Sequence, residues 1–295
     1  MPMPTATMFE YDFMRTAFLA GSLVAVVAGA VGFFLILRNL TFAGHALSHV
    51  GFAGATGAVL IGANPLWGLL ALTLAAALVM GLLGERLRGR DVAVGIILSL
   101  ALGLGVLFLY LYTSHATRAT AILFGNVLGV DARTVWALCG LTGVSLGALA
   151  FMARPLLFAT LAPELAAAKG VSLRLIAMLF LAIVAIAVAE AAQVVGVLLV
   201  FALMVAPAAT AQRLTARVGW GIALAVWLAL CETWAGLALA YATDWPTTFW
   251  IVLLSCVAYF LSLLVRPRHA SSPPEPLPVH QDPAIGRPTL TGGND

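Results

Sequence analysis

Charged residues are scarce in this sequence. Only 9% of its 295 residues are Asp, Glu, Lys or Arg, whereas 62% are hydrophobic, and the mean hydropathy is +1.06. A soluble domain carries about 25% charged residues, so a water-soluble globular fold is excluded. The net charge of +3 is too small to indicate a nucleic-acid partner. The composition is that of a protein embedded in a lipid bilayer.

Cysteine is also scarce. Cys139, Cys231 and Cys256 are scattered through apolar segments without metal-binding spacing. This pattern excludes a disulfide framework and a cysteine metal site, and it favours packing roles. A cleavable signal peptide is not evident either, because the first apolar run, Ala17–Leu37, is long enough to span a membrane and lacks a clear cleavage site.

The apolar runs are long and continuous, and they lack the two-residue alternation of barrel strands. Backbone groups must be satisfied internally within a bilayer, so we expect an all-α polytopic membrane bundle with eight to nine transmembrane helices. Nine spans are predicted, at residues 16–37, 41–62, 66–84, 92–112, 134–152, 175–192, 194–211, 218–242 and 247–265, with turns at Gln193 and Arg213–Arg217. Eight remain if one glycine-rich segment is broken. Residues 121–130 are apolar but too short to span, which predicts a re-entrant segment or half-helix.

Basic residues are distributed unequally between the two sides that nine spans define. One side receives most of them: Arg38, Arg86, Arg88, Arg90, Arg154, Lys169, Arg174, Arg213, Arg217, Arg266 and Arg268. The other side receives only Arg15, Arg118 and Arg133. The positive-inside rule then predicts a periplasmic leader at residues 1–15 and a transmembrane domain at 16–265. Residues 266–295 are rich in Pro, Ser and Gly, which predicts a disordered cytoplasmic tail.

One sizeable polar insert interrupts the spans, at Ala153–Arg174. Pro163 suits the start of a helix, Glu164 suits its first turn, and Lys169 with Gly170 suits its end. We therefore expect a short helix outside the membrane, running Pro163–Lys169. It is either a docking surface for another protein or an interfacial helix lying on the lipid.

His45 and His49 bring two imidazoles into an apolar, glycine-rich span. Residues four apart lie on one face of a helix, and this spacing lets two imidazoles hold one transition metal. No Glu follows the first His, so the metalloprotease motif is absent. The alternative is that each His bonds a backbone carbonyl or a Ser and only packs, but polar groups are costly inside a membrane.

Two acids, Glu190 and Glu232, also fall in apolar segments. A carboxylate in hydrocarbon must be paired, protonated or turned toward a polar cavity. Each is either a way-station for a metal or a proton, or a residue near a helix end that reaches interfacial water.

Over roughly Thr16–Val265, the chain resembles the permease subunits of bacterial ABC importers for zinc, manganese and iron. The resemblance rests on four stretches in order: RNLTFAGHALSHVGFAG at 38–54, DVAVG at 91–95, the helix at Pro163–Gly170, and VGVLLVFALMVAPAATA at 195–211. It implies a permease homodimer in the bacterial inner membrane, with no tightly bound cofactor. It also implies an ABC ATPase docked on the coupling helix and a periplasmic metal-binding protein that delivers the ion. The coupling-helix residues are Pro163, Glu164, Leu165, Ala166, Lys169 and Gly170. The chain has no Walker A pattern, so a separate subunit must hydrolyse ATP.

The sequence departs from the family pattern at His45, where the family usually has Asp. The resemblance assigns the metal site to this position and to His49. Carboxylate oxygens suit manganese and imidazoles suit zinc, so the substitution predicts a zinc importer, with manganese or iron as alternatives.

Three other functions compete with this prediction. A permease for a metal chelate shares the architecture but needs a wider pathway. A secondary metal–proton antiporter using Glu190 and Glu232 would not depend on ATP. A membrane metalloenzyme would need an acid or base beside the metal, and neither His has one next to it in the sequence.

Overall fold

The computed structural model describes residue 8 and residues 10–83, 90–111, 125 and 127–265. The described chain is helical. Its elements are α2 (Asp12–Leu37), α3 (Thr41–Leu60), α4 (Pro65–Leu83), α5 (Arg90–Leu111), the 3-10 turn η1 (Val127–Gly129), α7 (Ala132–Leu161), α8 (Pro163–Ala168), α9 (Leu173–Val195), α10 (Val197–Leu214), α11 (Val218–Thr243) and α12 (Thr247–Leu264). The predicted all-α membrane bundle is confirmed.

Eight of the described helices are long and apolar enough to cross a membrane, which lies within the predicted range. The long helix that falls short of this apolarity is α3. It forms over Thr41–Leu60, but its histidines, glycines, serine and threonines make it the least lipid-like of the predicted spans. It is nevertheless largely buried, with Ala46, Leu47 and Ala53 fully enclosed.

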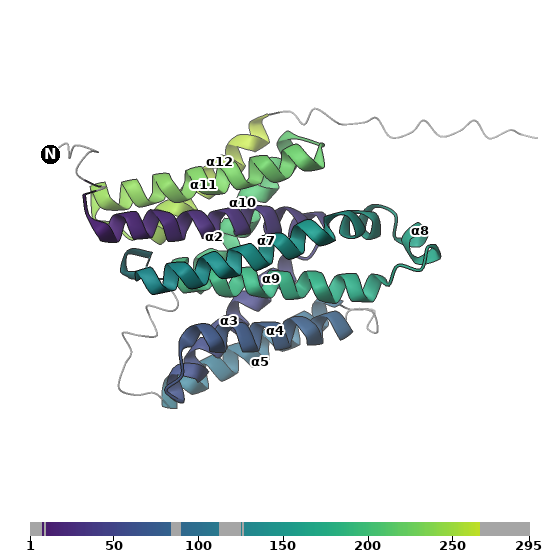
Figure 1. Ribbon diagram of the computed structural model, residues 1–295, viewed down its shortest axis with the longest axis horizontal. Helices are drawn as coiled ribbons and strands as arrows, with labels where there is room; N and C mark the ends of the chain where they lie inside the picture. The colour runs from purple at the N-terminus through teal and green to yellow at the C-terminus, as the bar shows by residue number, and fades with distance from the viewer. Residues whose placement is uncertain (1–7, 9, 84–89, 112–124, 126, 266–295) are drawn as a thin grey trace, which may run out of the picture.

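The helices form three groups (Figure 1). Helices α2, α7 and α9 lie in the middle, α3–α5 lie on one side, and α10–α12 lie on the other. The core sits around α2 and α9, most of whose residues are buried, whereas α5 and α12 are mostly exposed. In a membrane protein the bilayer is the solvent, so large exposed side chains such as Phe151 and Tyr110 are compatible with the fold.

Cross-helix hydrogen bonds tie both outer groups to the middle. Gln212 Nε2 on α10 donates to the Phe33 carbonyl on α2 at 2.8 Å, and Trp234 Nε1 on α11 donates to Ser22 Oγ on α2 at 2.8 Å. On the other side, Thr73 Oγ1 on α4 donates to the Ala185 carbonyl on α9 at 3.4 Å. These bonds satisfy polar groups inside the bundle, because the bilayer core supplies no water to hydrogen-bond them.

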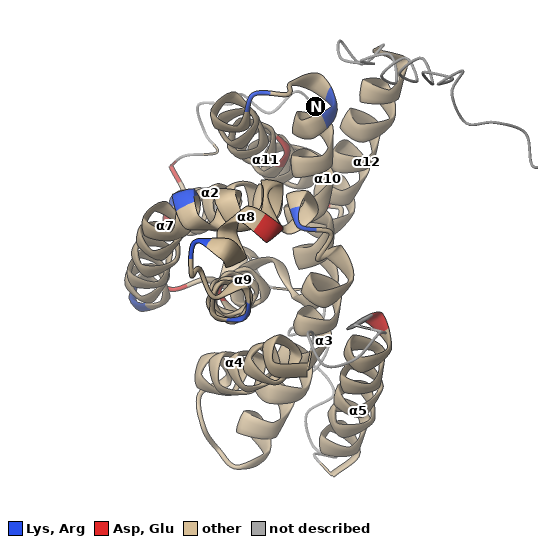
Figure 2. Cartoon of the chain, turned by 90° about the vertical axis from the view of Figure 1, so that its right-hand side faces the viewer, with Lys and Arg blue, Asp and Glu red and all other residues tan. Residues whose placement is uncertain are grey.

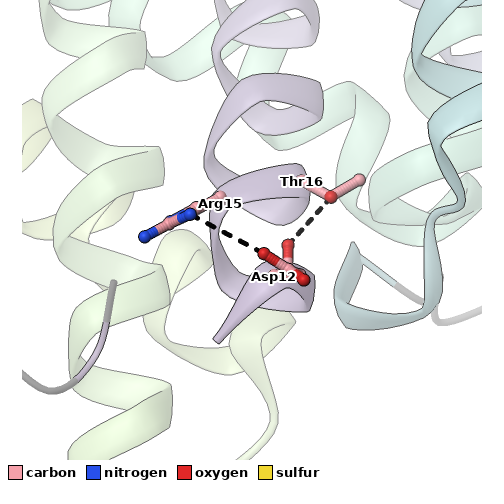
Figure 3. A network of polar contacts seen from close by, with 3 residues as sticks. All are labelled: Asp12, Arg15 and Thr16. Atoms are coloured by element: carbon pink, nitrogen blue, oxygen red, sulfur yellow. Dashed lines mark hydrogen bonds and ion pairs between the residues drawn. The ribbon is translucent and has the colours of Figure 1, made fainter. Parts of the chain in front are cut away.

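Helix α2 begins at Asp12, earlier than the span predicted from Thr16 (Figure 3). The Thr16 hydroxyl donates to the Asp12 carbonyl at 2.9 Å, and the Arg15 Nη1 and Asp12 Oδ1 atoms lie 3.7 Å apart. Acidic residues in a first turn are favoured by the helix dipole, so Asp12 is suited to start the helix.

Two further predicted boundaries are wrong. The fifth span was expected to end at Met152, but α7 continues through Pro155 to Leu161, because Met152, Leu156 and Ala159 continue its buried face. The turn expected at Gln193 lies at Gly196 instead. Gly196 has φ +82°, a conformation that side chains rarely allow, and it separates α9 from α10 as a single residue.

The segment predicted as re-entrant lies partly outside the described residues. Its described end contains η1, which packs against α2 and buries Val127. The described residues thus show a short turn here and no half-helix. The expected tail at 266–295 and Arg86, Arg88 and Arg118 also lie outside the described residues.

Candidate functional site

The histidine pair lies on α3. The imidazole rings of His45 and His49 face each other, with centroids 4.8 Å apart and ring planes at 83°. Both side chains are half-buried. They lie one turn apart because α3 is regular through both residues, and the small residues around them, such as Gly44 and Ala46, let other helices approach closely.

No hydrogen bond joins the nitrogens of the pair to the part of the chain that the structure describes. His45 Nδ1 is buried and makes no hydrogen bond, and neither ring is bonded to a carbonyl or a serine. The Ser48 hydroxyl, which could have bonded a ring, donates to the Gly44 carbonyl at 3.2 Å instead. The interpretation that each His only packs by bonding the backbone is therefore not supported. Both side chains are only half-buried, and His45 Nδ1 is the nitrogen of the pair that is buried without a partner.

The other predicted ligands do not join this pair. Among the described residues, no group of three or more His, Cys, Asp or Glu side chains could hold a metal ion. The two imidazoles are the donors that the described part of one chain brings together. A transition metal such as zinc takes four ligands, so two imidazoles make half of a site.

Glu190 lies on α9 and is fully buried, at 0% exposure. The Thr142 hydroxyl on α7 donates to its Oε1, and its Oε2 has no partner. The Ser145 hydroxyl, one turn further along α7, is also buried without a partner. The alternative that Glu190 reaches interfacial water is wrong, because its side chain is fully buried against α7.

Glu232 has the same arrangement in the outer group of helices α10–α12. It lies on α11 at 5% exposure, and the Ser255 hydroxyl on α12 donates to its Oε2. Its Oε1 has no partner. Each acid thus joins a neighbouring helix through a hydroxyl, and each retains one unpaired oxygen.

The short helix predicted outside the spans is α8, Pro163–Ala168. Pro163 stands in its first turn with Glu164, and Lys169 caps its end with Nζ 5.8 Å from the centroid of the Phe158 ring. Gly170 takes φ +78° where the chain turns toward α9. Ala166 is buried, whereas Leu165 is 52% exposed, so one face of α8 packs against the rest of the protein and the other is exposed.

Helix α8 lies at one end of the bundle, and Lys and Arg residues surround it in the end view of Figure 2. The basic residues at the helix ends on this side are Lys169, Arg174 on α9, Arg213 on α10 and Arg217 before α11, and Arg154 lies before the last turn of α7. Arg15 and Arg133 lie at the starts of α2 and α7, the opposite ends of those helices. This distribution follows the charge asymmetry predicted from the sequence.

Sequence analysis missed one residue of the site. Phe201, near the start of α10, packs edge-on against His45 with centroids 4.9 Å apart and planes at 70°. It lies within the stretch at 195–211 that carries the family resemblance, but no periodicity indicates a contact with a residue so distant in sequence.

The bundle of apolar helices makes this chain a multi-pass membrane protein. The sequence profile of the ABC 3 transport family matches residues 10–266. The chain belongs to this family, and it is therefore a membrane permease subunit and not an enzyme.

Relatives and a solved structure agree with this assignment. The manganese transport system membrane protein MntC of Halalkalibacterium halodurans is 30% identical over 262 residues, covering 88% of this chain and 90% of the relative. The manganese import system permease protein ScaB of Streptococcus parasanguinis is 31% identical over 260 residues, covering 88% and 92%. The structure of PsaBC from Streptococcus pneumoniae in complex with Fab superposes with a TM-score of 0.80 at 25% identity, covering 89% of this chain and 95% of that chain.

Proposed function

We propose that this chain is the membrane permease of an ATP-driven importer of divalent transition metal ions, and that the ion passes through the face of α3 that carries His45 and His49. The observation that carries the proposal is the pair of adjacent imidazoles, which is half-buried in a membrane bundle and shows no hydrogen bond to any of the described residues. Intramembrane ionisable residues are rare and mark ion pathways.

Manganese is the ion best supported for this chain. MntC and ScaB, which share 30% and 31% identity with it, are both named for manganese transport. The zinc preference predicted from His45 remains a second candidate, because imidazole nitrogen suits zinc better than manganese. A site for transport must also release its ion, so two nitrogen donors need not bind manganese tightly.

A second copy of the chain is proposed to complete the ligand set. The described residues provide two donors, whereas zinc takes four ligands and manganese prefers six. The two histidines are half-exposed, so a partner placed across a two-fold axis could add its own pair. The proposed assembly is a homodimer in the bacterial inner membrane.

The other proposed partners follow from the family. An ABC ATPase would dock on α8, whose exposed residues Glu164, Leu165 and Lys169 form a small mixed surface at the basic end of the bundle. A periplasmic metal-binding protein would deliver the ion at the opposite end. Transport by this permease would require ATP hydrolysis, whereas a secondary antiporter would not.

The test is ATP-dependent manganese uptake by the permease and its ATPase in proteoliposomes, with zinc as competitor. His45→Ala and His49→Ala are expected to abolish uptake while the complex stays assembled. Ser48→Ala, on the same helix and bonded only to the Gly44 carbonyl, is the matched control and should transport normally. Normal uptake by both histidine variants would overturn the proposal and make Glu190 and Glu232 the next residues to test.

A further inference from the structure

Helix α10 brings an aromatic ring onto the histidine pair. The Phe201 ring packs edge-on against His45 at a centroid distance of 4.9 Å, and His45 in turn packs against His49 at 4.8 Å. The three rings form a continuous series of edge-on contacts, and Phe201, which cannot bind a metal, lies at one end of it. Because His45 Nδ1 is buried without a hydrogen bond, no donor or acceptor fixes the orientation of this ring. Packing must therefore fix it.

The position of Phe201 is itself fixed closely. Helix α10 starts directly after Gly196, whose φ of +82° turns the chain sharply out of α9. A Cβ added to Gly32 on α2 would clash with the Met204 carbonyl, so the two helix backbones touch one turn beyond Phe201. On the C-terminal side of that contact, Gln212 Nε2 on α10 donates a hydrogen bond to the Phe33 carbonyl on α2. Helix α10 is thus held against α2 at points on the C-terminal side of Phe201.

The start of α10 is connected along the chain to α8. Helix α9 follows α8 and runs to Val195, and Gly196 alone joins it to α10. The backbone of Gly125 lies against Val195 and Gly196 so closely that any side chain there would clash. Gly196 therefore joins the packed end of α9 directly to the first turns of α10, where Phe201 lies.

We propose that Phe201 is a positioning residue for the metal pathway, which holds the His45 ring in the orientation that presents its Nε2 to the ion, and that the Gly196 turn places Phe201 there. This inference rests on the proposed function, because it assumes that His45 binds the transported ion. Mutating an outer-shell partner that orients a metal-binding histidine typically lowers metal affinity 10- to 100-fold. Phe201 has this task through ring packing, because a hydrogen bond to Nδ1 is missing.

The experiment measures uptake of manganese as a function of its concentration, using the assembled complex in proteoliposomes. Phe201→Ala is expected to raise the half-saturating concentration about tenfold while the maximal rate is largely kept. Phe201→Tyr keeps the ring and should restore the parent value. Leu198→Ala, an exposed residue of the same helix, is the matched control and should match the parent.

Two further variants keep the test decisive. If Phe201→Ala fails to assemble, Phe201→Leu keeps most of the volume without the ring and should show the same rise. Gly196→Ala strains the turn without touching His45, and it should raise the half-saturating concentration in the same direction. A residue with a merely structural role would lower the amount of assembled complex and the maximal rate at an unchanged half-saturating concentration.

The outcomes separate this inference from the proposed function. If His45→Ala abolishes uptake but Phe201→Ala and Phe201→Leu leave the half-saturating concentration unchanged, the positioning role is wrong and the metal pathway stands. If His45→Ala and His49→Ala transport normally, the proposed function itself is wrong. Co²⁺ binding gives a second readout, because its absorption spectrum reports imidazole coordination: Phe201→Ala should weaken Co²⁺ binding, and an unchanged titration would also contradict the inference.

Discussion

Gly54 on α3 and Gly68 on α4 lie backbone to backbone, so a Cβ added to either residue would clash with the carbonyl oxygen of the other. This contact sets how closely the histidine-bearing helix approaches its neighbour. Small residues allow such close approach in membranes, where packing drives helix association. The position of α3, and with it of the histidine pair, therefore depends on two residues without side chains.

Substituting either glycine should loosen this contact. Gly54→Ala and Gly68→Ala are each expected to lower the free energy of unfolding by about 1–3 kcal/mol, the usual cost of overpacking. Thermal unfolding in detergent measures the effect. Gly140→Ala and Gly147→Ala on α7 face open space and are the matched controls, which should be neutral or slightly stabilising. Equal losses in all four variants would show that close packing is not the cause.

The bond between Thr142 and Glu190 should stabilise the contact of α7 with α9. Thr142→Val leaves the buried carboxyl without its donor and is expected to cost about 1–3 kcal/mol. Thr142→Ser keeps the hydroxyl and should recover most of this loss. Denaturation in detergent is again the measurement, and a Thr142→Val protein as stable as the Ser variant would contradict the role of the bond.

Glu190→Gln tests the same residue as a possible metal ligand. We expect this variant to keep manganese uptake, because Glu190 bonds Thr142 and is not gathered with the histidines in the described structure. A complete loss of uptake in an assembled complex would instead place Glu190 on the ion pathway.

The end of α8 should matter for coupling to ATP hydrolysis. Gly170 takes φ +78°, where an L-residue is strained by about 1–2 kcal/mol, so Gly170→Ala should displace the end of α8. The expected result is weaker association with the ATPase, measured by co-purification and by stimulated ATP hydrolysis. Gly219→Ala, at the start of α11 with open space around it, is the control. Unchanged association in Gly170→Ala would argue against α8 as the docking site.

Ion preference should follow the chemistry of residue 45. His45→Asp replaces a nitrogen donor by carboxylate oxygen, so uptake of manganese relative to zinc is expected to rise. Competition between the two ions in proteoliposomes measures this ratio. If zinc uptake stayed intact and manganese uptake did not rise, the argument from ligand type would fail.

Much of the fold was predictable because a bilayer requires continuous apolar helices, and such runs are visible in sequence. Boundaries were predicted less well. The polar insert at Ala153–Arg174 suggested that a span ends at Met152, but Met152, Leu156 and Ala159 keep α7 packed through Pro155. A turn was predicted at Gln193, whereas the chain turns at Gly196, where glycine readily adopts the positive φ.

The site was predictable only in part. The spacing of His45 and His49 is local, and helical geometry alone brings the two rings together. The contact of Phe201 with His45 and the bond of Thr142 to Glu190 join residues far apart in sequence, and tertiary packing decides them. The ligands that would complete the metal site are not gathered in the described part of one chain, so neither its pattern nor its fold identifies them.

X-ray absorption spectroscopy of the metal-loaded complex tests the central claim most directly. With zinc bound, imidazole scattering at about 2.0–2.1 Å is expected in the parent protein. It should be lost in the His45→Ala, His49→Ala double variant, and it should persist in Ser48→Ala. An imidazole signal that survives in the double variant, or a parent spectrum without imidazole, would contradict the assignment of the ion pathway to this pair.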